Sequence, residues 1–345
     1  MSSISRTVFV ILLVVLIQPV RAQDKVLLTE KPGTFRIRQG ILNGLSMDLY
    51  GKESNFSASE AEAAMNELEE LVHIFRQCPV LKEIKGFDAD CDLGAGRYSS
   101  KYGFGVPSTL TFYLRTWSLY KGKEAQWIIE PPQWRMEINM TDKYRDNGFN
   151  ESDFSNAYNP TNQDFSEEAM RSAVVEVNEL FYQPGIRETI TPGIDRYGDT
   201  YVIYNPDRPP YWEQVTIREA YRLLINYWKC VPDKSQSDVF VPMLNKELSG
   251  FTEEEKDSYA YFGNPESVYR IVPVKNGTPV MRSSPEYWNM NLPRSAIQIM
   301  VFETPDDATV KNKMENCYRG GDGYYYIYRL LDELEIRSLQ TVISR

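Results

Sequence analysis

Asp88, Asp90 and Asp92 stand at alternate positions in a short acidic stretch. Carboxylates with this spacing begin a calcium-binding loop, in which hard oxygen ligands converge on one ion. The rest of that loop is missing, because Leu93 stands where it needs glycine and Ser99 stands where it needs a bidentate glutamate. We interpret the stretch as a turn-rich loop, with the three aspartates as candidate ligands of an incomplete calcium site. No other cofactor is indicated.

Paired carboxylates offer a second kind of chemistry, since glycoside cleavage needs two of them and no histidine. Glu130 and Glu137 fall on or beside neighbouring predicted strands, and Asp195 and Asp199 flank a predicted turn close to several aromatic residues. Such pairs keep a carboxylate-based glycan hydrolase open as an alternative. The separation in space that defines a catalytic pair cannot be read from one sequence.

Tyr211 and Trp212 end a segment, residues 204–212, that is dense in proline and aromatic residues. A stiff, proline-rich loop can present rings to a partner at low entropic cost, which makes these two residues candidates for binding. The alternative is structural: tryptophan is usually largely buried, so Trp212 would fix the loop against the next helix.

His73 is the only histidine in the chain, and this excludes catalytic sites that need two or more histidines. Zinc hydrolases need two or three imidazoles, and no GxSxG segment supplies a serine nucleophile for His73 to activate. Helical spacing places His73 beside Glu69, Glu70 and Gln77, so we expect it on a solvated face. The sequence therefore leans away from an enzyme without excluding one.

Residues 1–22 have the pattern of a secretory signal peptide. Arg6 precedes the apolar run Val8–Ile17, and Val20 and Ala22 occupy the positions that a signal peptidase reads. That run is shorter than the ~20 residues needed to cross a bilayer. We expect cleavage between Ala22 and Gln23, and a mature chain that is secreted or periplasmic.

The charge of the chain argues against a nucleic-acid partner. The formal charge is −10, and cleavage would remove Arg6 and Arg21 and no acid, which leaves −12. An acidic chain repels phosphate backbones. The hydrophobic share of 42% is that of a folded globular protein, and no second apolar run reaches membrane length.

The four cysteines, Cys78, Cys91, Cys230 and Cys317, would permit two disulfides in an exported chain. Four cysteines allow three connectivities, and a Cys78–Cys91 bridge would leave Cys230 with Cys317. Free thiols are the alternative, because a chain of this length can bury enough surface to fold without cross-links.

Residues 23–150 are predicted to be strand-rich with one long helix. Ser57 and Glu60 form a capping box ahead of apolar residues at helical spacing. Alternation of apolar and polar residues predicts strands with short, antiparallel connections. In chain order we predict a strand at 35–38, a helix at 57–77, a loop at 85–107 and strands at 109–117, 126–130 and 134–140.

Residues 151–345 are predicted to be more helical, after a polar connection at 141–164. Thr216 and Glu219 form a capping box, and Trp228 completes an apolar stripe on the helix that follows. We predict helices at 166–182, 217–229, from 252, 306–317 and 330–342, and strands at 200–204, 268–274 and 296–303. Residues 324–328 fit either state. The class is α+β, with antiparallel strands packed against amphipathic helices, and the two regions could form one compact domain.

Taken together, these features predict an exported, soluble protein that binds a ligand or a partner without catalysis, in the periplasm or outside the cell. A glycan hydrolase is one alternative. A structural subunit of an envelope assembly is another, and a large exposed apolar patch would favour it.

Overall fold

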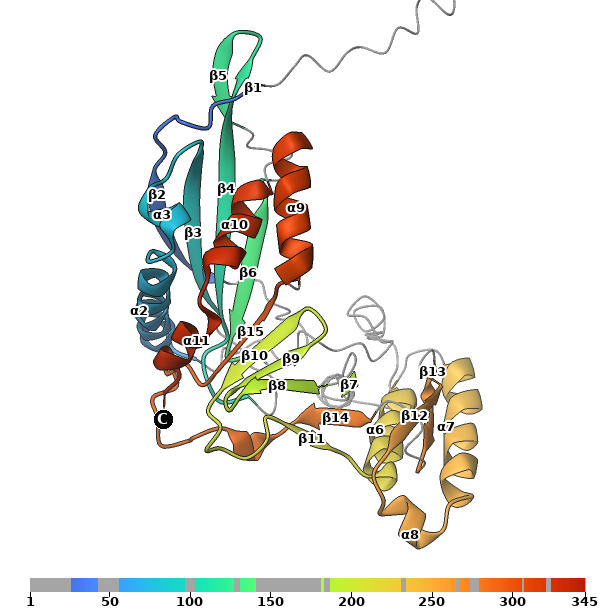
Figure 1. The fold of residues 1–345 in the computed structure, drawn as a ribbon. Coiled ribbons are helices and arrows are strands. Elements are labelled where there is room, and N and C mark those ends of the chain that lie inside the picture. The colour runs from blue at the N-terminus through green and yellow to red at the C-terminus, as the bar shows by residue number, and fades with distance from the viewer. Residues whose placement is uncertain are drawn as a thin grey trace, which may run out of the picture.

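A large mixed sheet forms the body of the protein in a computed structural model (Figure 1). The structure describes residues 26–42, 56–96, 103–126, 131–140, 181–182, 187–230, 234–264, 267–273, 279–305, 307–320 and 324–344. The signal-peptide prediction and the polar connection at 141–164 therefore lie outside the described residues. Within the described ranges, no helix has the length and apolarity needed to cross a membrane.

Ten of the described strands belong to this sheet. In spatial order its main path is β2 (Phe35–Leu42), β3 (Phe87–Gly96), β4 (Ser108–Tyr120), β6 (Gln133–Ile138), β15 (Ile299–Glu303), β10 (Thr200–Tyr204), β9 (Ile194–Tyr197) and β8 (Arg187–Thr191). The short strands β1 (Val26–Leu27) and β5 (Lys123–Gln126) pair with β4. Because β15 lies between β6 and β10, the two halves of the chain contribute to one sheet.

The strands β4, β5 and β6 are antiparallel, as their short connections predict. The strand predicted at 126–130 is displaced, because β5 ends at Gln126, and residues 127–130 lie outside the described ranges. The pair β2 and β3 is parallel, which needs a long crossover. The helix α2 (Ala58–Phe75) supplies it. Its start confirms the predicted capping box: Ser57 Oγ accepts from the Glu60 N–H at 3.2 Å, and the Glu60 carboxylate accepts from the Ser57 N–H at 2.7 Å.

One face of the sheet carries the main core. On β3 the side chains of Ala89, Cys91 and Leu93 are at most 1% exposed and pack beneath the helices. These helices are α2, α3 (Pro79–Lys82), α10 (Tyr325–Glu333) and α11 (Ile336–Leu339). Side chains alternate along a strand, so the aspartates between these core residues lie on the other face.

A smaller lobe is inserted between β11 (Trp212–Gln214) and β14 (Val280–Ser283), which pair with each other. It has its own core and stands beside the sheet at the lower right of Figure 1. Its elements are α6 (Ile217–Cys230), α7 (Lys234–Ser249), α8 (Glu253–Lys256), β12 (Tyr261–Asn264) and β13 (Ser267–Val272). The predicted stripe on α6 is confirmed, because Ile217, Tyr221, Leu224 and Trp228 are all buried.

Several predicted elements are wrong in extent or type. The acidic loop at 85–107 is largely strand β3, and the single helix at 330–342 is divided into α10, α11 and a short 3₁₀ helix at Gln340–Val342. Residues 325–328 are helical, and α7 was not predicted. Most of the predicted helix at 166–182 lies outside the described residues, and Phe181–Tyr182 form strand β7. The remaining helix, α9 (Asp307–Gly320), agrees with its prediction.

The proposed Cys78–Cys91 disulfide is wrong, because both thiols are free. Cys91 is on β3 and faces the core, whereas Cys78 precedes α3, and both are buried. Burial raises the pKa of the Cys78 thiol to about 11, and it raises the pKa of Cys91 still more. The side chains of Cys230 and Cys317 lie outside the described residues.

Neither thiol is therefore expected to react with iodoacetamide at pH 8 while the protein is folded, since only an accessible thiolate is nucleophilic. Peptide mapping by mass spectrometry should find Cys78 and Cys91 unmodified in the native protein. Both should be modified in guanidinium chloride without a reductant. Modification that requires a reductant would instead reveal disulfides.

Candidate functional site

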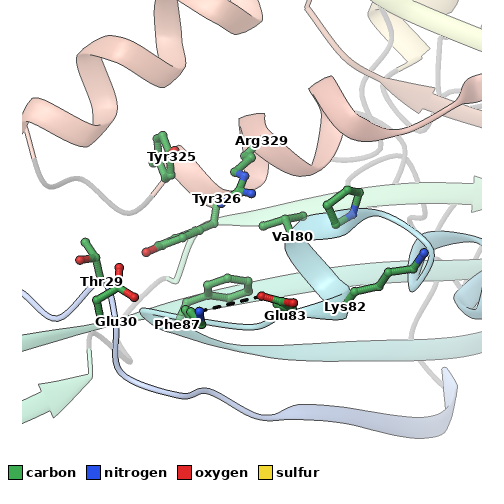
Figure 2. Close-up of a pocket in the computed structure, with 11 residues that line it drawn as sticks. Thr29, Glu30, Val80, Lys82, Glu83, Phe87, Tyr325, Tyr326 and Arg329 are labelled. Carbon is green, nitrogen blue, oxygen red and sulfur yellow. Dashed lines mark ion pairs between the residues drawn. The ribbon is translucent and has the colours of Figure 1, made fainter.

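A cavity of about 500 Å³ opens at one end of the main sheet, between α3, α10 and the turn after β1 (Figure 2). This volume is within the range of about 300–1,000 Å³ usual for small-ligand sites. Its lining comes from three segments far apart in sequence: Thr29 and Glu30; Pro79, Val80, Lys82, Glu83, Lys85 and Phe87; and Tyr325, Tyr326 and Arg329.

Two packed rings form the floor of the cavity. Tyr326 of α10 lies over Phe87 of β3, with ring centroids 4.3 Å apart, and both are at least 95% buried. Gly86 makes this packing possible, because its φ is +83° and a Cβ there would overlap the Tyr326 hydroxyl oxygen. The rings therefore close the cavity from below and leave no slot between them.

The wall that carries Thr29 and Glu30 is held by backbone hydrogen bonds. The Leu28 N–H donates to the Trp117 carbonyl at 3.0 Å, and the Gly86 N–H donates to the Lys31 carbonyl at 2.7 Å. These bonds join the turn after β1 to β4 and to the loop before β3. The backbone of this turn, from which Thr29 and Glu30 project, is thus held in place by the sheet.

The opposite wall is organised by Glu333, which joins α10 to α3. Its carboxylate accepts from the Val80 backbone N–H at 2.6 Å and from Arg329 Nε at 2.9 Å. Among the described residues, Nε is the only nitrogen of Arg329 with a hydrogen-bond partner. The guanidinium is therefore fixed in place while its terminal amino groups can still donate.

The charged side chains of the lining are unevenly paired. Lys85 Nζ lies 3.9 Å from the Glu83 carboxylate, too far for a hydrogen bond but close enough for partial compensation of charge. Glu30 and Lys82 have no ion pair within the described part of the chain. The cavity is thus apolar at its floor and carries charge of both signs at its rim.

The structure corrects the calcium-loop interpretation of Asp88, Asp90 and Asp92. These residues are on strand β3, and arginines on the neighbouring strands pair with Asp90 and Asp92. Asp90 is 1% exposed and accepts from Arg36 Nε at 2.9 Å and from Arg115. A straight strand cannot wrap its carboxylates around one ion, and the described residues contain no group of three or more potential ligands placed to hold a metal.

Asp92 and Asp88 have their own partners on this polar face. Asp92 accepts from Arg38 Nε at 2.7 Å. Burial disfavours the charged form of Asp88, but hydrogen bonds from Gln126 and from the Thr34 N–H hold its pKa below the usual value. The three carboxylates thus connect β3 to its neighbours in the sheet, and none of them is left without a partner.

Asp195 also has a structural environment. It is fully buried, and its carboxylate accepts from the Arg187 guanidinium at 2.7 Å, the Thr189 hydroxyl at 2.9 Å and the Tyr211 hydroxyl at 2.7 Å. Asp199 lies in the turn after β9, and its side chain is 66% exposed. The suggested Asp195–Asp199 pair therefore consists of a buried carboxylate whose oxygens already accept hydrogen bonds and an exposed carboxylate on the surface.

The two candidate binding rings are buried as well, which supports the structural alternative. Tyr211 is 3% exposed and Trp212 is 4% exposed, and both pack in a core of aromatic residues behind β10 and β15. Tyr211 also bonds to the Tyr197 hydroxyl at 2.9 Å. Burial raises the pKa of Tyr197 to about 12 and raises that of Tyr211 as well. These rings are not presented to a partner.

The remaining candidates lie apart from the cavity. Glu137 is buried on β6, with Arg135 Nε 3.4 Å from its carboxylate, and Glu130 lies outside the described residues. His73 is exposed on α2, as predicted. The cavity itself was missed by the sequence reasoning. Its strongest local signal is Gly86 immediately before Phe87, since a glycine there permits a close approach by Tyr326.

Comparison with known proteins gives no relative. No family model, no curated protein and no solved structure matches the chain.

Proposed function

We propose that this chain is an exported binding protein that holds a small ligand in the cavity between α3 and α10. The cavity carries the proposal: it is large enough for a small molecule, has an apolar floor and has polar side chains on two walls, of which Arg329 is held by Glu333. Export is supported by the signal-like pattern of residues 1–22.

The cavity supports binding better than glycan hydrolysis. It has two carboxylates near aromatic residues, Glu30 and Glu83. The general acid of a glycosidase is a carboxyl group kept protonated by an apolar pocket. The Glu83 side chain lacks such a pocket, because it is 80% exposed and lies beside Lys85. The floor rings pack on each other, so they offer no face on which a sugar could stack.

An envelope subunit has no comparable support in the described residues. Their exposed large apolar side chains are distributed over separate elements, for example Val26 on β1, Ile190 on β8 and Val239 on α7. An assembly surface would instead gather such residues into one patch.

Blocking the cavity tests the proposal. Thr29→Trp places a large ring at one wall, where the backbone is held by β4 and the side chain is only partly buried. A panel of amino acids, dipeptides and hexoses would be screened by saturation-transfer NMR against the wild-type mature protein. We expect Thr29→Trp to weaken binding of the compounds found by at least about tenfold, a loss of ~1.4 kcal/mol.

Asn66→Trp is the matched control, because it adds the same ring on the exposed face of α2, away from the cavity. It should bind like wild type. Equal binding by the Thr29→Trp and wild-type proteins, or no binding by any member of the panel, would contradict the proposed site.

A further inference from the structure

The charges of the cavity are separated between its two walls. Glu30 belongs to the turn after β1, whereas Lys82 and Arg329 belong to α3 and α10. Figure 2 shows Glu30 near Thr29 at one side of the cavity and Lys82 at the far side, beyond Val80. Acidic and basic side chains therefore line opposite ends of the same cavity.

These end charges are available to a ligand. Within the described ranges neither Glu30 nor Lys82 has an ion pair, whereas Arg329 is paired through Nε with Glu333 and keeps its terminal amino groups as donors. Glu83 and Lys85, which also line the cavity, lie 3.9 Å apart and partly compensate each other. A ligand with one charge would meet a partner at one end and an unmatched charge at the other.

The floor between the ends sets what the middle of the ligand can be. Phe87, Tyr326 and Val80 are buried and apolar or aromatic there, so a short apolar segment can cover them without losing hydrogen bonds. The closed packing of the two rings gives little selectivity for a ring on the ligand. Selectivity must then come from the charged ends.

We propose that the ligand of this cavity is a zwitterion of the amino acid or short peptide class. Its carboxylate lies toward Lys82 and Arg329, and its ammonium lies toward Glu30. This inference rests on the proposed binding function of the same cavity. Arginine and lysine suit the carboxylate because both donate charge-assisted hydrogen bonds, and the carboxylate of Glu30 suits the ammonium.

A matched set of three probes tests the inference by isothermal titration calorimetry with the mature protein. The dipeptide Ala-Leu carries both charges, N-acetyl-Ala-Leu carries only the carboxylate, and Ala-Leu amide carries only the ammonium. We expect Ala-Leu to bind most tightly and each modification to weaken binding by at least about tenfold, because each removes a charge-assisted hydrogen bond.

Two variants assign each end of the ligand to a wall. Glu30→Gln should weaken Ala-Leu about tenfold and leave N-acetyl-Ala-Leu unchanged, because only the first has an ammonium. Lys82→Met should weaken Ala-Leu and leave Ala-Leu amide unchanged. Both residues are exposed, so the fold should tolerate the changes. Glu62→Gln on α2 and Lys123→Met on β5 are exposed controls of the same kind and should bind as wild type.

The outcomes separate the inference from the function on which it rests. If none of the three probes binds, or if a singly charged probe binds as well as Ala-Leu, the zwitterion class is wrong. The cavity function would still stand if another compound binds and Thr29→Trp abolishes that binding. If Ala-Leu binds wild type and the Glu30→Gln, Lys82→Met and Thr29→Trp variants with the same affinity, both proposals are wrong.

Discussion

Replacing Trp228 by alanine is expected to lower the free energy of unfolding by about 3–5 kcal/mol, the usual cost of emptying a buried aromatic site. Trp228 is 6% exposed in the core of the small lobe. Its ring stacks on Phe240 of α7 with centroids 4.1 Å apart and also contacts Tyr227, so its loss removes packing between α6 and α7. Urea unfolding followed by far-ultraviolet circular dichroism measures the change.

The neighbouring substitution Lys229→Ala is the control for Trp228. Lys229 is exposed on the same helix, and its replacement should change stability by no more than about 0.5 kcal/mol. Because the lobe has its own core, the unfolding curve can show two transitions. In that case Trp228→Ala should shift the transition of the lobe to lower urea concentration. Superimposable curves for Trp228→Ala and wild type would show that this ring does not support the lobe.

Replacing Asp195 by alanine is expected to cost about 3 kcal/mol, near the lower end of the range for breaking a buried ion pair. The change removes the acceptor that lies 2.7 Å from the buried Tyr211 hydroxyl and leaves this hydroxyl with Tyr197 as its remaining partner. Arg187 loses its ion-pair partner too, but it still donates to the Tyr204 hydroxyl and its side chain is 46% exposed to water, which limits the cost. Thermal and urea unfolding should both register the loss.

Asp199→Ala provides the comparison for Asp195, since it removes the same carboxylate four positions along the chain. Its side chain is 66% exposed and lies 4.0 Å from Arg196, so the expected change is within about 0.5 kcal/mol. Equal effects of the two substitutions would mean that the buried hydrogen bonds of Asp195 contribute nothing to stability.

The elements that could be predicted from sequence are those whose signals are local. Helices α2 and α6 each combine a helix-start signal with apolar residues at helical spacing, and β4 to β6 combine alternation with short turns. In these cases the residues that determine the structure are within a few positions of each other. Hydrophobic periodicity and capping were therefore sufficient.

Strand β3 shows where local reasoning fails. Its aspartates and glycines disfavour strands, although Ala89, Cys91 and Leu93 alternate with the aspartates. The strand pairs with β2 and β4 and buries Ala89, Cys91 and Leu93 in the core, and Arg36 and Arg38, 54 positions earlier, compensate the charges of Asp90 and Asp92. Helix α7 was missed for a similar reason: it contains Pro242, and its stability comes from packing on α6.

The cavity could not be predicted from sequence at all. Glu30, Lys82 and Arg329 are brought to one space by the turn after β1, α3 and α10, and each is ordinary in its own segment. The opposite holds for Asp195, Tyr211 and Trp212. Their residue types suggested a site, and burial in the core explains them.

The position of β15 also sets an order of events in folding. Residues 299–303 separate β6 from β10, so the sheet stays in two parts until these residues have been synthesised. β6 and β10 each lack a partner on one side until a strand more than 90 residues further along the chain pairs with them. Such long-range pairing is slow and leaves unpaired strands that can aggregate. Until β15 is added, β6 and β10 each present an open strand edge on which another chain could pair.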